Sequence, residues 1–395
     1  MKSALMKFTP RFSAKLLLIF FTFALMLALL SVLNGCSGMG KNPMMTPPGA
    51  TASFAFVANS GSGNVSAFAV STTGSLSAVA GSPFPAGAGA EFMALDSVHK
   101  FLFVSNQNAN SLSAFSVNTS TGVLTPVQGS PFSTGVTPHG VAVDSAGKFV
   151  FVGNEGGSVS VFSINGTTGM LTPAPGSPFA ASSPFGIAVN PAGTFLYVTN
   201  TSTGGLSPSS VSTFHIDPTT GALTAVNSPV TTGTTPIGIT ADPNGKFLYL
   251  GEHMTETLAT FSTDPTTGAL TRVGSSTPAS SAGCGVSCHL APLRVAVHPN
   301  DQFLFVANVG GNSVSVFNIN NGPAPATSTP APTGQHPFGV ALDAMGNFLL
   351  AANKMDNTIS AFSVNSSTGG LTSVSGSPFP AGGSAPTGIV IVSKQ

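Results

Sequence analysis

The chain has 395 residues, of which 42% are hydrophobic and only 6% charged, with 12 basic and 12 acidic side chains. With no basic patch, no charge run and no Trp, the sequence argues against nucleic acid as a partner. The abundance of Gly (46) and Pro (31) favours short strands joined by tight turns over long charged helices.

The first 35 residues predict a lipoprotein signal peptide. Four basic residues before position 16 are followed by a largely apolar run over 16–33, the order of the charged and hydrophobic regions of a signal peptide. The sequence Leu33-Asn34-Gly35-Cys36 resembles the lipobox of bacterial lipoproteins, in which cleavage leaves the Cys for lipid attachment. The run is also nearly long enough to span a bilayer, so an uncleaved signal anchor is the alternative.

Both alternatives place the rest of the chain outside the cytoplasm. We expect a lipid on Cys36, a flexible tether over 36–50 and an exported protein anchored to the bacterial cell envelope, with the membrane as its partner through the lipid. After cleavage the chain carries 8 basic and 12 acidic residues, a net charge of −4.

Residues 51–395 contain seven copies of a segment of the form P-x-G-[IV]-A-V-D, the weakest of them at Ala90–Asp96. The copies start 45 to 56 residues apart, a period typical of stacked supersecondary units. Each unit predicts four strands: this segment, a run such as FLYVTN after a tight turn, an alternating run such as SVSVFSI, and a short LTPV strand. The pattern predicts an all-β fold, a seven-bladed β-propeller of four-stranded blades.

The two ends of this region predict how the ring closes. The first unit begins at its second strand, Ser53–Val57, and the last unit ends with an unpartnered first strand, Pro386–Ser393. The C-terminal strand is therefore expected to complete the N-terminal blade, which removes the exposed edges of an open array.

The repeats resemble the YVTN family of β-propellers, through FLYVTN at 195–200, Pro191–Gly193 and Ser158–Phe162. Over 51–395 they also resemble the wider lactonase group, typified by bacterial 6-phosphogluconolactonase. That group has a G-P-R-H segment followed by H-P; the chain keeps His298-Pro299, shifts the Arg by one place to Arg294 and lacks the next His. The pair Pro138-His139 resembles another position of the group. The resemblance implies the fold and only in part an activity on lactones.

Connectivity predicts which residues meet at one rim of the central channel. First strands start, and second strands end, at the same rim. Six second strands end in Asn and the seventh in Glu252, followed by His253. At the start of the first strands the ionisable exceptions are Glu91, His139 and Arg294. Concave sites with a few polar groups are favoured for binding.

An elongated crossing on this rim carries the other two cysteines, Cys284 and Cys288, with His289 beside them. In an oxidising compartment an isolated pair is expected to form a disulfide, and a metal site with His289 is the alternative. We expect no cofactor, and the sequence has no G-x-S-x-G elbow, phosphate loop or zinc motif.

Lactone hydrolysis would need a general base and support for an oxyanion. His139 is the candidate base, Arg294 the candidate oxyanion or acid-group ligand, and Glu252 an assistant, with Glu91, His253 and His289 lining the ligand rim. Each also has a structural interpretation: the Asn residues as turn caps, Glu252 as a solvated loop residue, His139 and Arg294 as channel-wall residues.

Three functions therefore remain open. The first is a binding module of the cell envelope for a glycan, a protein or an anionic small molecule. The alternative is a lactone hydrolase of the 6-phosphogluconolactonase type. The third is a structural surface protein.

Overall fold

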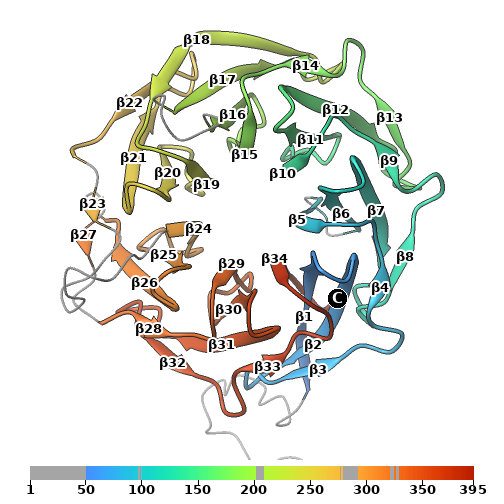
Figure 1. The fold of residues 1–395 in the computed structure, drawn as a ribbon, viewed down its shortest axis with the longest axis vertical. Helices are drawn as coiled ribbons and strands as arrows, with labels where there is room; N and C mark the ends of the chain where they lie inside the picture. The colour runs from blue at the N-terminus through green and yellow to red at the C-terminus, as the bar shows by residue number, and fades with distance from the viewer. Residues whose placement is uncertain are drawn as a thin grey trace, which may run out of the picture. The chain divides into compact units, whose positions relative to one another are not determined.

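The computed structural model describes residues 50–96, 98, 100–201, 209–275, 277–278, 292–320, 324–325 and 329–395. These residues form seven antiparallel sheets, arranged as blades around a central axis (Figure 1). The described part of the chain contains no helix, and so none that is long and apolar enough to cross a membrane. The prediction of a seven-bladed β-propeller is confirmed. The predicted signal peptide and Cys36 lie outside the described residues.

Each blade runs outward from the axis in four strands. The innermost strands are β5 (Ala90–Leu95), β10 (Pro138–Val143), β15 (Pro184–Val189), β19 (Pro236–Ala241), β24 (Pro292–Val297), β29 (Pro337–Leu342) and β34 (Pro386–Ser393). The second strands are β6 (Phe101–Asn106), β11 (Phe149–Asn154), β16 (Phe195–Asn200), β20 (Phe247–Glu252), β25 (Phe303–Asn308), β30 (Phe348–Asn353) and β1 (Thr51–Asn59). A blade is named below by its innermost strand.

The outer half of each blade is built from shorter pieces. The third strands are β7 (Ser111–Val117), β12 (Ser158–Ile164), β17 (Ser210–Ile216), β21 (Thr257–Thr263), β26 (Ser313–Asn318), β31 (Thr358–Val364) and β2 (Asn64–Ser71). The fourth are β8 (Leu124–Pro126), β13 (Leu171–Pro173), β18 (Leu223–Thr231), β22 (Leu270–Arg272), β27 (Ala324–Pro325), β32 (Leu371–Ser373) and β3 (Leu76–Ala78). In six blades a two-residue strand of the crossing also pairs with the third strand: β9 (Phe132–Ser133), β14 (Phe179–Ala180), β23 (Thr277–Pro278), β28 (Ala331–Pro332), β33 (Phe379–Pro380) and β4 (Phe84–Pro85).

The ring closes as the sequence predicts. β34 pairs antiparallel with β1, so that Ile391 lies opposite Ala55 and Val392 opposite Phe54 (Figure 1). The last strand of the chain is thus the innermost strand of the blade that begins at its N-terminal end, and every blade has both neighbours.

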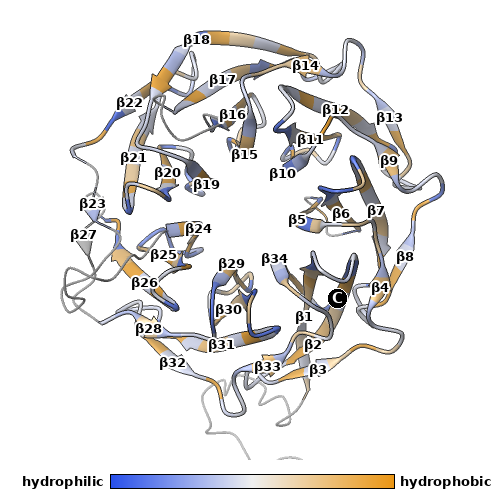
Figure 2. Cartoon of the chain, in the orientation of Figure 1, coloured by the Kyte–Doolittle hydropathy of each residue, from blue (hydrophilic) through white to orange (hydrophobic). Residues whose placement is uncertain are grey.

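The hydrophobic core lies between neighbouring blades. Phe54 and Phe56 of β1, for example, pack with Leu102 and Val104 of the next blade. Most strongly hydrophobic residues accordingly lie along the strands, and many connecting loops are hydrophilic (Figure 2). Because each blade buries its two faces against its neighbours, the blades form a closed support for side chains that point toward the axis.

Candidate functional site

The innermost strands pack closely because most of them have glycine at the third residue. Gly occupies this place in five blades: Gly140, Gly186, Gly238, Gly339 and Gly388. A Cβ on Gly140 would lie 2.6 Å from the carbonyl oxygen of Phe185, the second residue of the next innermost strand, and one on Gly339 would overlap the carbonyl oxygen of Thr387. In the remaining two blades the third residue is Phe92 or Arg294. Their side chains therefore turn toward the axis.

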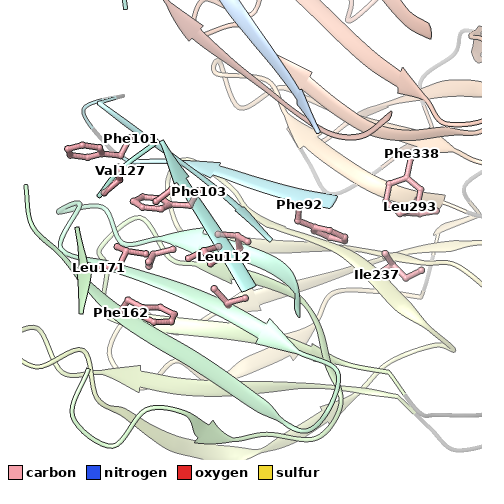
Figure 3. Close-up of a cluster of buried hydrophobic side chains, with 14 of the residues drawn as sticks. Phe92, Phe101, Phe103, Leu112, Val127, Phe162, Leu171, Ile237, Leu293 and Phe338 are labelled. Carbon is pink, nitrogen blue, oxygen red and sulfur yellow. The ribbon is translucent and has the colours of Figure 1, made fainter. Parts of the chain in front are cut away.

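Phe92 closes the channel. Its ring lies edge to face with those of Phe185 (5.7 Å between centroids) and Phe338 (6.3 Å), and is 1% exposed. Figure 3 shows Phe92 reaching from β5 toward Ile237, Leu293 and Phe338, which come from three other blades. We call the five residues Phe92, Phe185, Ile237, Leu293 and Phe338 the plug. The plug separates the mouth of the channel, where the second strands end, from the side of the hairpins that join first and second strands.

An ionisable cluster lies at the mouth. The Nδ1 atom of His139 is 2.7 Å from Oε2 of Glu91, and its Nε2 atom is 3.1 Å from Oε2 of Glu155. The His139 ring stacks on Phe185 at 4.0 Å. Glu91 and His139 are buried, whereas 36% of the Glu155 side chain is exposed. The amide nitrogen of Gln107 lies 3.5 Å from His139 Nε2.

The two carboxylates determine the charge of His139. An ionised carboxylate only accepts hydrogen bonds, so both ring nitrogens can bond only when both carry a proton. Burial lowers the pKa of His139, but the hydrogen bonds and negative charges of Glu91 and then Glu155 outweigh it, and the pKa lies above the ordinary 6.5. His139 therefore keeps its imidazolium form to higher pH than a free histidine, with one buried and one solvent-accessible carboxylate partner.

Arg294 lies on the other side of the plug. Its Cζ atom is 3.6 Å from the centroid of Phe92. It borders a cavity of about 70 Å³ whose lining includes Met93, Val295 and Val340, each the fourth residue of an innermost strand. Burial lowers the pKa of Arg294 to about 10 and the charge of Glu91 opposes this shift, so Arg294 stays cationic at neutral pH. The structure brings Glu91 and His139 together but places Phe92 between His139 and Arg294.

Glu252 lies within its own blade. Its carboxylate is 1% exposed and accepts hydrogen bonds from the backbone N of Gly233 (2.7 Å), the hydroxyl of Thr257 (2.6 Å) and Arg272 (3.3 Å). In the β5 blade, Asn106 makes the corresponding contacts: it accepts from Gly87 N and donates to the hydroxyls of Ser111 and Ser113. Glu252 thus replaces an Asn that ties the end of the second strand to its neighbours. Its predicted catalytic role remains a prediction.

The basic side of the mouth is formed by the β19 and β29 blades. The Lys354 ammonium lies 4.6 Å from the centroid of Phe338, a plug residue. Burial lowers the pKa of His336, and the positive charges of Lys354 and then His253 lower it further. His253, predicted to line the rim, follows β20 directly.

The disulfide and metal predictions concern cysteines that the structure does not describe. Cys284, Cys288 and His289 lie outside the described residues, and both the disulfide and the metal alternative stay predictions. Within the described ranges, no group of three or more His, Cys, Asp or Glu side chains is placed to hold a metal ion.

Sequence reasoning missed Glu155 and Phe92. Glu155 directly follows a second strand, the same place that brought His253 to attention. Phe92 is one of only two residues that replace the third-position glycine. The signal for Phe92 was therefore present in the repeats, whereas the position of Glu155 differs in every blade and gives no consensus from which Glu155 departs.

The fold and this cluster define a class: a seven-bladed β-propeller with an ionisable site at one mouth of a plugged channel. The family model described as lactonase, 7-bladed beta-propeller matches residues 52–185, 173–287 and 290–385. The chain belongs to this lactonase family. No curated protein sequence matches it.

Solved structures show the same fold at low identity. A candidate 6-phosphogluconolactonase from Bacteroides uniformis is 22% identical with a TM-score of 0.74, covering 87% of this chain and 100% of that one. A second such candidate, from Bacteroides fragilis, is 20% identical with a TM-score of 0.71, covering 89% and 100%. A periplasmic gluconolactonase from Pseudomonas aeruginosa is 16% identical with a TM-score of 0.71, covering 87% and 99%.

Proposed function

We propose that the mouth of the channel binds a polyhydroxylated acid in its lactone form and hydrolyses the lactone ring. The observation that carries this proposal is His139, held between a buried and an accessible carboxylate above an apolar plug. Such a pair of groups can take a proton from water and give one to a leaving oxygen. Membership of the lactonase family and the similarity to a gluconolactonase support the substrate class.

In the proposed reaction, Glu155 takes a proton from a water molecule, and the oxygen of that water attacks the lactone carbonyl carbon. His139 then donates its Nε2 proton to the ring oxygen as the C–O bond breaks, which leaves a hydroxy acid. Glu155 and His139 Nε2 are 3.1 Å apart, so the proton taken from water can pass back to His139 and restore the starting state. Glu91 keeps the Nδ1 proton and orients the ring. Lys354 supplies positive charge for the acid group of the ligand, and His253 lies at the same rim.

A lactone hydrolysis assay tests the proposal. The full-length protein in detergent is followed by proton release on aldonolactones and their phosphates, with the spontaneous rate subtracted. We expect His139→Gln and Glu155→Gln to lose roughly 10²–10⁴-fold in kcat. His215→Gln is the matched control, because His215 is exposed on the third strand of the β15 blade and should keep the wild-type rate. A wild-type protein that accelerates no lactone contradicts the proposed chemistry.

Binding without catalysis is the second candidate. It is favoured by two observations: Phe92 lies between Arg294 and the mouth, and the Glu252 carboxylate has partners within its own blade. Two of the three residues first considered for catalysis are therefore not assembled with His139. Titration calorimetry with the hydroxy acids as well as the lactones distinguishes the two functions, since a binding module would hold both with no turnover.

We also propose that the protein is exported and anchored by a lipid on Cys36 to the bacterial cell envelope. The Leu33–Cys36 segment after the apolar run supports this proposal. Mass spectrometry of the mature N-terminus is the test. An unmodified Cys36 behind an intact 1–35 segment would rule out the lipoprotein.

A further inference from the structure

Arg294 is a partly exposed cation beside the plug, and its hydrogen-bonding groups are unused by the described residues. A guanidinium has five N–H donors in one plane. Arg294 stacks this plane against Phe92, with Cζ 3.6 Å from the ring centroid, and within the described ranges it has no hydrogen-bond or ion-pair partner. Stacking satisfies the face of the guanidinium but none of its N–H groups. Those groups are therefore open to water or to a small ligand in the cavity beside them.

The cavity beside Arg294 has room for a small ligand only. Its volume is about 70 Å³, and it is bordered by Arg294, four apolar fourth-position side chains including Ile389, and the backbone of Gly339 and Gly388. A water molecule takes up about 30 Å³ of liquid, so a sugar acid is too large for this space. The residues of β24 from Arg294 to Val297 are all partly exposed, which leaves a route for solvent from the hairpin side. The plug blocks the route from the mouth.

The charges around the plug favour an anion in this cavity. The two carboxylates on the mouth side of the plug, Glu91 and Glu155, both bond to His139, at 2.7 Å and 3.1 Å. Among the described residues, no carboxylate is bonded to the guanidinium of Arg294. Arg294 therefore lacks a bonded counter-ion on its own side of the plug, where a partly desolvated charge is costly.

We propose that the cavity is a binding site for one small monovalent inorganic anion, with chloride as the chemical type, held by the N–H groups of Arg294. The anion neutralises the guanidinium and holds it against Phe92. The stacked guanidinium then stabilises the plug from the side opposite the mouth. This site is separate from the proposed lactone site, and its existence does not depend on that activity.

Crystals of the protein soaked in sodium bromide give the direct test. We expect an anomalous bromide peak within hydrogen-bond distance of the Arg294 guanidinium. Density in the cavity that shows no bromide signal would mean water alone, and would overturn the proposal.

Thermal unfolding of the full-length protein gives the test in solution. The chloride concentration is raised at fixed ionic strength by replacing 2-(N-morpholino)ethanesulfonate, an anion too large for the cavity, with chloride. A ligand that binds only the folded state raises Tm with its concentration. We expect a saturable rise in wild type and no rise in Arg294→Met or in Val340→Met, which fills the cavity but keeps the charge. Lys354→Met, which removes the other cation stacked on a plug ring, is the control and should keep the rise. An equal rise of Tm with chloride in wild type and in Val340→Met would refute the site. This comparison holds even where Arg294→Met fails to fold.

Discussion

Deletion of residues 386–395 tests whether the last strand holds the ring together. The deletion removes β34 and leaves β1 as an open inner edge. Ile389, Ile391 and Val392 are 6%, 9% and 1% exposed in the closed ring. Burial of such a side chain contributes about 1.5–3 kcal/mol, so the three together account for about 5–9 kcal/mol. Domains of this kind have a total stability of about 5–15 kcal/mol, so the deletion removes about a third of it or more.

The assay is urea and thermal unfolding of the full-length and truncated proteins, followed by circular dichroism. We expect Tm to fall by the order of 10 °C or more, since 1 kcal/mol corresponds to about 2–4 °C in domains of 150–250 residues. Removal of Lys394 and Gln395 alone is the control, because both are exposed and follow the strand. A truncated protein that unfolds cooperatively at the wild-type temperature would refute the role given to β34.

Three further changes probe the inner ring, each measured as the free energy of unfolding in urea. The folded-state pKa of His139 is raised above 6.5, so its contribution to stability is fully present below about pH 6.5 and is lost as pH rises through the folded pKa. We expect Glu91→Gln to flatten this decline of the unfolding free energy with pH. An unchanged pH profile would contradict the pairing of His139 with Glu91. Gly339→Ala should lower the unfolding free energy by about 1–3 kcal/mol because its Cβ overlaps a neighbouring carbonyl oxygen. Gly166→Ala is the control and should be nearly neutral, because nothing lies close to the added Cβ. Equal losses of stability in the two variants would count against the close packing of the innermost strands. Phe92→Ala should cost about 3–5 kcal/mol, and a loss below 1 kcal/mol would mean that the plug is not part of the core.

The fold was predictable because the same short pattern returns in every blade. A strand such as FLFVAN, its turn and its alternating neighbour have one consistent local interpretation, and seven copies at a nearly constant period leave few topologies. The incomplete units at the two ends then determine how the ring closes. None of this requires knowledge of side-chain contacts.

The site was predictable only where a copy departs from a clear consensus. His139 and Glu91 stood out because other blades have apolar residues or Thr at that place. Glu155 did not, because the residue after the second strand differs in every blade, so there is no consensus to depart from. Glu252 stood out as a charge, yet its carboxylate accepts the backbone N–H of Gly233 as an Asn does elsewhere. A departure from the consensus thus marks a changed environment, and the geometry decides whether the change is structural or chemical.

The third-position glycines explain why the mouth and the cavity occur in this propeller. Each glycine lets one innermost strand approach the carbonyl of the next, so a side chain at that place cannot lie between the strands. Phe92 and Arg294 must therefore point inward, and they start from strands β5 and β24, which lie nearly opposite each other in the ring (Figure 1). Two inward side chains from opposite walls meet at the axis, which accounts for the stacking distance of 3.6 Å. The aromatic ring then closes the channel to the ligand proposed for His139 and Glu155, and the guanidinium faces the side that only small solutes reach. Two substitutions in an otherwise uniform ring are therefore sufficient to separate the mouth of the channel from the cavity beside Arg294.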